Sequence, residues 1–291
     1  MVSILKGFFF CFLFINGGLA FSKKDIEIEK IAQLPKFMYE TSGLAFLNDH
    51  IITHNDGGNK AELFVLNKKG KYEKTIQVEG VQNNDWEDIA LDEEKNLYIG
   101  DFGNNANSRK NLQIHIVKSG FIGKEKVTTR TIHFTYEDQQ KFPPKEKELE
   151  FDCEAFIVKG GKIFLFTKCR TKPYTGISKI YILPNRPGNY EAKLIGQFQF
   201  CDNGWLTCSV TAADYHHASN TLAILTYGRL YLITDFMFNA FWKGKIKKYK
   251  IPKVKQREAI CFLSDHTWLI TDEYRKGLKG GDLYKMKFKK K

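Results

Sequence analysis

The 291-residue sequence lacks any long amphipathic helical pattern, and after its first twenty residues it lacks an apolar run long enough to cross a membrane. Its apolar runs are short, rich in β-branched and aromatic residues, and bounded by Gly, Asn, Asp or Lys, a pattern typical of β-strands. The chain is 43% hydrophobic and 14% aromatic, so it can bury a large core and is not disordered. These features predict a single all-β domain over residues 21–291.

Several common catalytic and metal-binding motifs are also missing. The sequence has no nucleophile elbow, no Ser-His-Asp arrangement and no phosphate-binding loop. Its six cysteines form no Cys-x-x-Cys motif and no Cys/His spacing typical of a zinc site or a thiol nucleophile. These absences weaken the case for an enzyme without excluding one whose site is assembled from separate segments.

The positive charge does not follow the pattern of a nucleic-acid-binding protein. The net charge is +12 and residues 285–291 are rich in lysine, but the other lysines are scattered and no known nucleic-acid module occurs. Lysine on strand edges also protects them from aggregation. The charge is compatible with an anionic small molecule, or with an anionic surface such as a glycan or another polyanion. We expect a monomer with no stable membrane insertion.

The first twenty residues have the features of an export signal. Lys6 precedes the apolar block Phe8–Ile15, and small residues up to Ala20 lead into a charged stretch. The block is shorter than the ~20 residues of a membrane span, which favours a cleaved signal peptide over a membrane anchor. We expect residues 1–20 to be removed and the mature chain to be secreted or periplasmic.

Five short segments share one pattern: a hydroxyl residue or Glu, then small and apolar residues, a turn, and a second apolar run. The segments begin at Ser42, Glu87, Glu154, Thr211 and Glu258. A repeat of this period with several strands per unit is typical of a β-propeller. The sequence therefore predicts a β-propeller with five blades.

The two ends of the repeat array predict how the ring closes. The alternating segment Ile26–Leu34 has no blade of its own, and the last repeat ends after three strands. We expect Ile26–Leu34 to pair with Asp282–Phe288 and to supply the missing strand, because closure removes an exposed sheet edge. The alternative is six blades, with a degenerate one in the long interval between residues 87 and 154.

The innermost strands of a propeller line a central tunnel, so the five starting residues are expected to face one another at one end of it. Three glutamates at this position would repel one another and resist ionisation. Calcium relieves this conflict because it accepts six to eight oxygen ligands, and no His or Cys occupies the ring positions as zinc or copper would require. The sequence predicts one calcium ion bound by Ser42, Glu87, Glu154, Thr211 and Glu258. The alternative is a water-filled tunnel with protonated or arginine-paired glutamates.

The ends of the second strands are expected at the same mouth of the tunnel. His54 or Asp101 could act there as a general base, and Lys168 and Arg275 could hold an anion beside the metal. The alternatives are tight turns around His54 and Asp101, and structural salt bridges for Lys168 and Arg275.

The order of the five starting residues, Ser, Glu, Glu, Thr, Glu, resembles that of the calcium-activated nucleotidase (apyrase) family. This resemblance implies a five-bladed propeller with one calcium ion in its tunnel, held by Ser and Glu at equivalent positions. Thr211 stands where that family has Ser, and Gly43 stands where an acidic ligand follows the first Ser. The acidic N-terminal cluster of that family is absent.

Other segments resemble a broad group of uncharacterised secreted propellers. They are Thr-His-Asn-Asp-Gly-Gly-Asn at 53–59, Asp-Trp-Glu-Asp-Ile-Ala at 85–90, Gly-Asp-Phe-Gly-Asn-Asn at 100–105 with Arg109, and Asp-Cys-Glu-Ala at 152–155. This second resemblance is more specific in sequence, and it implies the fold without an activity.

Export permits disulfides. Cys201 and Cys208 flank one short loop and predict a bond. Cys153 and Cys169 lie at the start of one predicted strand and the end of its neighbour, which suggests a second bond and leaves Cys261 free.

Two function classes remain. One is a calcium-dependent hydrolase of an anionic substrate, such as a phosphate ester, a nucleotide or a lactone. The other is a non-catalytic binding or scaffold protein in which calcium only stabilises the ring. The propeller fold supports both classes.

Overall fold

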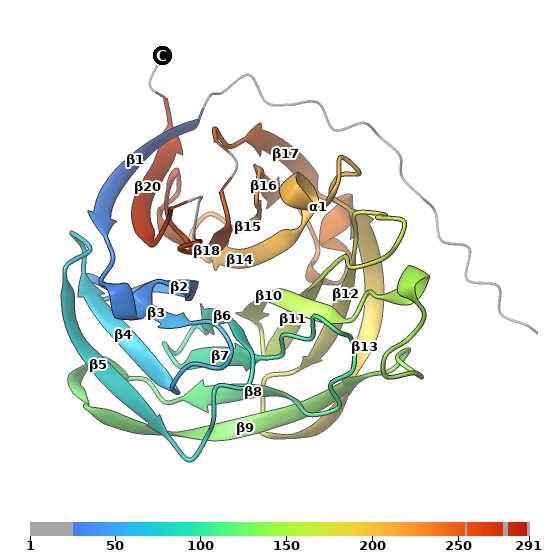
Figure 1. The fold of residues 1–291 in the computed structure, drawn as a ribbon, viewed down its shortest axis with the longest axis horizontal. Coiled ribbons are helices and arrows are strands. Elements are labelled where there is room, and N and C mark those ends of the chain that lie inside the picture. The colour runs from blue at the N-terminus through green and yellow to red at the C-terminus, as the bar shows by residue number, and fades with distance from the viewer. Residues whose placement is uncertain (1–25, 254, 276–278, 290–291) are drawn as a thin grey trace, which may run out of the picture.

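The computed structural model describes residues 26–253, 255–275 and 279–289, which form an almost entirely β-stranded ring (Figure 1). The segment 1–20, assigned above to an export signal, lies outside the described residues. Within the described ranges, no helix is long and apolar enough to span a membrane.

The strands pair as antiparallel units of four. The first unit contains β2 (Thr41–Leu47), β3 (His50–Asn55), β4 (Glu62–Asn67) and β5 (Tyr72–Glu79). The second contains β6 (Trp86–Leu91), β7 (Leu97–Asp101), β8 (Leu112–Val117) and β9 (Lys126–Tyr136). The third contains β10 (Asp152–Lys159), β11 (Lys162–Lys168), β12 (Ile177–Pro184) and β13 (Gly188–Gln199).

The last two units complete the ring. The fourth contains β14 (Val210–His216), β15 (Thr221–Thr226), β16 (Arg229–Thr234) and β17 (Lys245–Lys250). The fifth contains β18 (Arg257–Ser264), β19 (Thr267–Asp272), β20 (Asp282–Phe288) and β1 (Ile26–Gln33). The helices are the short α1 (Trp205–Cys208) and the 3-10 turns Lys36–Met38, Phe121–Gly123, Glu146–Glu148 and Phe238–Lys243.

The innermost strands β2, β6, β10, β14 and β18 each contact the next, and β18 returns to β2 (Figure 1). This arrangement confirms the β-propeller fold. The long interval between residues 87 and 154 contains, among its described strands, only β6–β9. Its extra length lies in the eleven-residue β9 and in the loop over residues 137–151.

The predicted closure by the N-terminal strand is confirmed. β1 pairs with β20 in antiparallel register from Ile26 opposite Phe288 to Gln33 opposite Asp282. The edge that β20 would otherwise expose is thereby covered.

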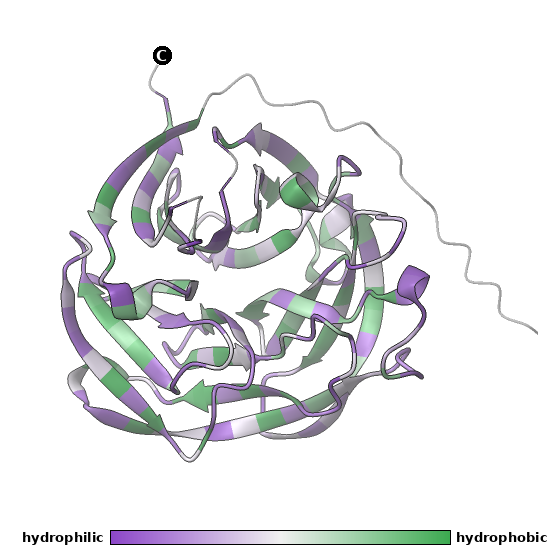
Figure 2. Cartoon of the chain, viewed as in Figure 1, coloured by the Kyte–Doolittle hydropathy of each residue, from purple (hydrophilic) through white to green (hydrophobic). Residues whose placement is uncertain are grey.

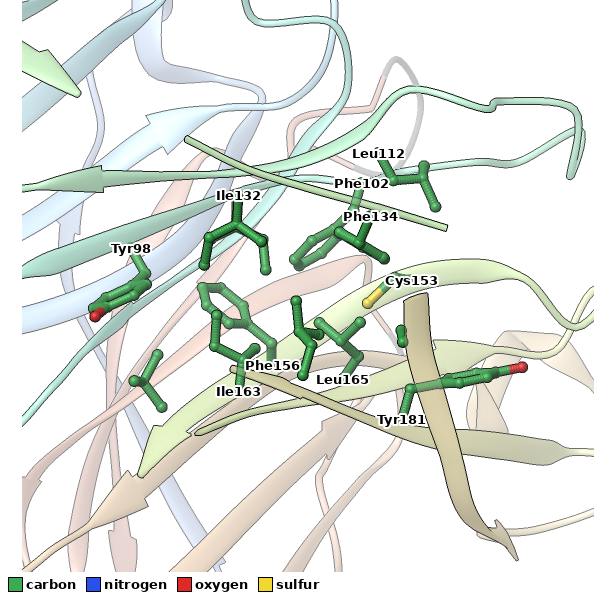
Figure 3. Close-up of a cluster of buried hydrophobic side chains, with 14 of the residues drawn as sticks. Tyr98, Phe102, Leu112, Ile132, Phe134, Cys153, Phe156, Ile163, Leu165 and Tyr181 are labelled. Carbon is green, nitrogen blue, oxygen red and sulfur yellow. The ribbon is translucent and has the colours of Figure 1, made fainter. Parts of the chain in front are cut away.

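The hydrophobic core is divided among the boundaries between neighbouring units. Each boundary holds one cluster of buried side chains. Figure 3 shows the cluster between the second and third units, where Ile132 and Phe134 of β9 pack with Phe156 of β10 and Leu165 of β11. Along the outer strands hydrophobic residues alternate with hydrophilic ones, as expected where one side is solvated (Figure 2).

Two aspartates, the buried Asp88 and the partly buried Asp214, connect the innermost strands. The Asp88 carboxylate accepts hydrogen bonds from the backbone N–H groups of Ile89, Phe156 and Ala213 at 2.9, 3.3 and 3.4 Å. Asp214 accepts one from the N–H of Phe262 at 2.7 Å. These hydrogen bonds connect the innermost strands of the second, third, fourth and fifth units, and the same strands carry side chains at the mouth.

The cysteines follow the sequence prediction in part. Cys201 and Cys208 form a disulfide with a Cα–Cα distance of 5.3 Å, which confirms the first bond. The predicted Cys153–Cys169 bond is wrong, because both cysteines are free. The strand register explains this: Cys153 lies opposite Thr167 and its thiol enters the core cluster, whereas Cys169 follows the end of β11. Cys261 is free and buried, as expected.

Candidate functional site

The candidate site begins with an irregularity that all five innermost strands share. In each, the pairing with the next strand shifts register by one residue and leaves that residue unpaired, as in a β-bulge. The unpaired residues are Gly43, Glu87, Glu154, Thr211 and Glu258. Four of the five predicted metal ligands therefore occupy one equivalent position, and a bulge is a common way of turning a side chain out of a strand toward a site.

Ser42 is the exception, because it stands one residue before the bulge of its strand. It pairs with His54, and its hydroxyl donates a 2.5 Å hydrogen bond to the backbone carbonyl of Glu87. The equivalent residue in β2 is Gly43, whose φ of +68° suits glycine. A Cβ at Gly43 would lie 2.7 Å from Nε2 of His54. The first unit thus contributes no side chain at this position, and the imidazole occupies the space beside it.

A compact carboxylate cluster lies at the junction of the first and second units. Carboxylate oxygens of Asp56, Asp85 and Glu87 lie within 4.8 Å of one another. Glycines leave room for it: a Cβ at Gly103 would lie 2.2 Å from Oε1 of Glu87, and one at Gly57 would lie 2.3 Å from Oδ1 of Asp85. The predicted calcium ring contains Glu87 but neither Asp56 nor Asp85, so the structure adds two carboxylates to the candidate ligands.

The electrostatics of this cluster disfavour the fully ionised state. Burial, with contributions from Asp85 and Glu258, raises the pKa of Asp56 to about 7. Burial and Asp152 raise the pKa of Asp85 to about 6. Burial and the neighbouring carboxylates, Glu154 first, raise the pKa of Glu87 well above its ordinary value. Within the described ranges, none of these three acids forms an ion pair with a lysine or arginine.

On the other side of the mouth the acids are neutralised by cations. Nζ of Lys168 lies 2.9 Å from Oε1 of Glu154, and a guanidinium nitrogen of Arg170 lies 3.1 Å from the same oxygen. Lys168 also donates to the Tyr227 hydroxyl at 3.2 Å, and that hydroxyl donates to Oε1 of Glu258 at 2.9 Å. Burial opposes the charge of Lys168, but Glu154 raises the Lys168 pKa well above its ordinary value.

Among the described residues, the buried polar atoms without a hydrogen-bond partner include Oγ1 of Thr211, Oδ1 of Asn55 and Nε2 of His54. Unpaired buried acceptors are rare, because each costs about 1–3 kcal/mol. The carboxylates of Asp56, Asp85 and Glu87 give an all-oxygen donor set, which fits a hard cation such as calcium.

His54 and Asp101 lie beneath the mouth. His54 is fully buried, its Nδ1 is 2.8 Å from the carbonyl of Asn55, and burial lowers its pKa to about 4. Asp101 is fully buried and accepts hydrogen bonds from Arg109, Asn84 and the backbone N–H of Asp85 at 2.8, 2.6 and 3.1 Å. Asp101 therefore holds the loop that carries Asp85.

Arg275 is exposed at the rim, two residues after a carboxyl group that follows the end of β19. That group is Glu273, which hydrogen-bonds Gln256. Burial, together with the charges of Glu258 and Asp56, raises the Glu273 pKa to about 8, and Arg275 opposes the rise. The structure thus brings the three ring glutamates and Lys168 into one electrostatic group at the mouth, with His54 and Asp101 below it and Arg275 at its edge.

Comparisons with known proteins support the fold. No protein-family model matches the chain, and no curated protein matches it. Among solved structures, the chain is similar to the PQQ-bound aldose sugar dehydrogenase of Streptomyces coelicolor, with a TM-score of 0.50 and 9% identity over 91% of this chain and 99% of that one. It is also similar to a gluconolactonase of Xanthomonas campestris, with a TM-score of 0.47 and 10% identity over 91% of this chain and 90% of that one. At such low identity the likeness to the dehydrogenase is one of fold alone, and it agrees with the β-propeller described above.

Proposed function

We propose that the protein is an exported calcium-binding β-propeller that hydrolyses an anionic substrate of the lactone, phosphate-ester or nucleotide type. The observation that carries the proposal is the cluster of Asp56, Asp85 and Glu87, which lacks neutralising cations within the described residues and lies at the same mouth as the cationic Lys168. Acids without a cation beside a buried lysine suit a metal next to a bound anion.

The calcium ligands in this proposal are Glu87, Asp56 and Asp85, with Glu258, Thr211 and Glu154 of the predicted ring facing the same tunnel. Ser42 contributes indirectly, by fixing the backbone at Glu87. When bound, calcium would supply a Lewis acid that polarises a carbonyl or phosphoryl oxygen.

The residues of the chain divide the remaining tasks. Lys168 and the exposed Arg275 hold the anion of the substrate. Glu273 is the proposed general base, because its pKa of about 8 lies near the working pH of a base and it stands at the mouth. Asp101 and His54, the bases expected from the sequence, act indirectly in this proposal. Asp101 positions the loop that carries Asp85, and His54 fills the space beside Gly43.

The alternative is a scaffold in which a cation only stiffens the ring. The ion pairs of Glu154 favour this alternative, because they neutralise one predicted ligand without any metal. The resemblance to the nucleotidase family supports the enzyme, and the resemblance to the uncharacterised secreted propellers supports neither. The partner would be an anionic small molecule in the first case, and a surface glycan or another polyanion in the second.

An activity screen distinguishes the two. The full chain would be assayed with ATP, p-nitrophenyl phosphate and glucono-δ-lactone, each with 1 mM calcium and with excess chelator, at about pH 8. We expect calcium-dependent turnover of at least one substrate, and loss of this turnover in Glu273→Gln. The control Asp49→Asn should retain the turnover, because Asp49 is exposed and pairs with Lys68 rather than with a residue of the mouth. Calcium binding without turnover of any of these substrates would support the scaffold, and no calcium binding would contradict both.

A further inference from the structure

A disulfide-closed loop at the start of the fourth unit presents an indole to solvent beside the mouth. The loop runs from Cys201 to Cys208 and includes the short helix α1. Trp205 is 50% exposed and Leu206 is 57% exposed, whereas Trp86 and Trp268 are fully buried. Trp205 and Leu206 thus form an adjacent pair of exposed apolar side chains on a loop closed by a disulfide.

The loop is held rigidly against the fourth unit. The carbonyl of Thr207 accepts hydrogen bonds from the backbone N–H of Gly228 at 3.3 Å and the hydroxyl of Thr226 at 2.9 Å. Arg229 donates to the side chain of Asn203 at 3.0 Å. An aromatic side chain on an anchored loop loses little conformational entropy when a ligand binds, which is how rigid aromatic anchors act at binding surfaces.

One residue connects this indole to the charged part of the site. The Tyr227 ring meets Trp205 edge to face, with centroids 6.5 Å apart and planes at 76°. The ammonium of Lys168 lies 5.3 Å from the centre of the same tyrosine ring, whose hydroxyl bonds Glu258. Trp205 is therefore positioned to contact a part of a ligand whose charged part is held by Lys168.

The arrangement of the rings favours a sugar over a nucleobase. A flat base is held best between two parallel rings, and the rings of Trp205 and Tyr227 are close to perpendicular. The parallel pair at this rim, Tyr39 and Tyr274, is stacked on itself at 4.8 Å and leaves no slot. A single open indole face suits the C–H groups of a pyranose ring, because the negative π face attracts their partial positive charge. Asp202 and Asn203, both polar and exposed on the same loop, are suited to its hydroxyls.

We propose that the Cys201–Cys208 loop is a carbohydrate subsite, in which Trp205 stacks on a ring of an acidic oligosaccharide whose carboxylate or phosphate lies at the calcium and Lys168. This inference rests on the proposed function and narrows its ligand to acidic carbohydrates.

The test measures sugar binding and calcium binding separately. With calcium saturating, isothermal titration would use trigalacturonate as the acidic sugar, maltotriose as the neutral sugar, citrate as the acyclic anion and ATP as the nucleotide. We expect trigalacturonate to bind more tightly than the other three, and to protect tryptophan emission from acrylamide quenching. The quenching signal reports on Trp205 and the partly buried Trp242, because Trp86 and Trp268 are fully buried, and the signal that Trp205→Ala removes is that of Trp205.

Three variants make the test specific. Trp205→Ala should weaken trigalacturonate about tenfold and leave calcium affinity unchanged, since one stacked ring contributes about 1 kcal/mol or more. Trp205→Tyr should restore part of the affinity, and Met237→Ala, which replaces an exposed apolar residue outside this loop, should change nothing. Tighter binding of ATP than of trigalacturonate, binding of neither, or equal affinity in wild type and Trp205→Ala would overturn the subsite. A failure of calcium to bind would instead overturn the proposed function.

Discussion

Each side of the mouth has a glutamate at the bulged position of an innermost strand, but the two glutamates have different charged neighbours. Glu87 and Glu154 both occupy the bulged position of an innermost strand. Glu154 has Lys168 and Arg170 within 3.1 Å, whereas Glu87 has two further acids, Asp56 and Asp85, as neighbours. One side therefore carries cations beside its glutamate, and the other side is a set of acids without them.

This difference indicates that equivalence in a repeat does not fix the role of a residue. The bulge sets where each glutamate points, while the strand ends and loops around it set its partners. Lys168 and Arg170 come from the end of β11 and the residues after it. At the corresponding place after β7, Phe102 and Gly103 bring no cation and leave room for the acids. The charges around each glutamate are thus set by the strand ends and loops, and the propeller only supplies the equivalent positions.

The largest expected effect concerns the ion-paired side. Lys168→Met should lower the free energy of unfolding by on the order of 3 kcal/mol, because it leaves Glu154 buried with only the partly exposed Arg170 as partner. Urea denaturation of the full chain measures it. The control is Lys172→Met, which removes an exposed lysine paired with an exposed Glu146 and should have no measurable effect. Equal stability of the two variants would show that the Lys168 network does not support the ring.

The next effect concerns the acidic side. If calcium binds only the folded chain, then calcium at about 100 times its dissociation constant should add roughly 2.7 kcal/mol of stability. Glu87→Gln should remove most of this gain, because it removes a carboxylate ligand that no lysine or arginine of the described residues neutralises. Glu154→Gln should remove less, because Glu154 is already paired with Lys168 and Arg170.

Thermal melts with calcium and with chelator provide the measurement for both variants. From the sequence alone Glu154 is an equal member of the calcium ring, so the two substitutions would be equivalent. A greater loss in Glu154→Gln than in Glu87→Gln would restore that interpretation and reverse the comparison between the two sides.

The metal-free protein should also respond to pH at the acidic side. The folded-state pKa values of Asp56 and Asp85, about 7 and about 6, lie above the ordinary value near 4 of an unfolded chain. The folded state then binds more protons than the unfolded state, so these groups lower the free energy of unfolding as pH rises from about 4 to about 7.

Calcium should oppose this loss, because it binds the ionised carboxylates and replaces their protons. The stabilisation by calcium should therefore grow between pH 5 and pH 8. Denaturation curves over this range, with and without chelator, test the direction, and Asp56→Asn should flatten the metal-free slope. A calcium effect that is constant or declines with rising pH would contradict the assignment of these acids as ligands.

Much of the fold could be predicted from the sequence, because the spacing of the repeated segments shows where each unit of strands begins. The starting residues, the strand alternation and the orphan segment Ile26–Leu34 gave the ring and its closure, which the pairing of β1 with β20 confirms. The Cys201–Cys208 bond was readable from its short loop. The prediction of a Cys153–Cys169 bond was wrong, because adjacent strands can pair in more than one register and Cys153 lies opposite Thr167.

The site was harder to predict, because its members come from positions that the repeat does not share. A repeat pattern aligned Ser42 with Glu87, although the register shift places Gly43 there. The signal was a glycine within an otherwise apolar strand, which often marks a bulge. Asp85 and Glu273 carry no pattern of their own, since a carboxylate next to a strand is common. Only the packing of the first and second units brings Asp85 to Asp56, whereas Glu273 lies near Glu258 because β18 and β19 pair within the fifth unit.

The smallest expected effect tests whether the acidic side needs its space as well as its charges. Gly103→Ala keeps every carboxylate, but its Cβ would lie 2.2 Å from Oε1 of Glu87 and 2.5 Å from Cγ of Asp85, so at least one acid must move. Calcium requires its oxygens at 2.3–2.6 Å, and we therefore expect a loss of about threefold to tenfold in calcium affinity, with little change in metal-free stability. Gly123→Ala is the matched control, because its Cβ would meet no described atom within 4 Å. Calcium titration of both variants gives the answer. Unchanged affinity in Gly103→Ala would mean that the cation is held by the ring glutamates away from Asp85, whereas a selective loss would place it between the two acids that this glycine admits.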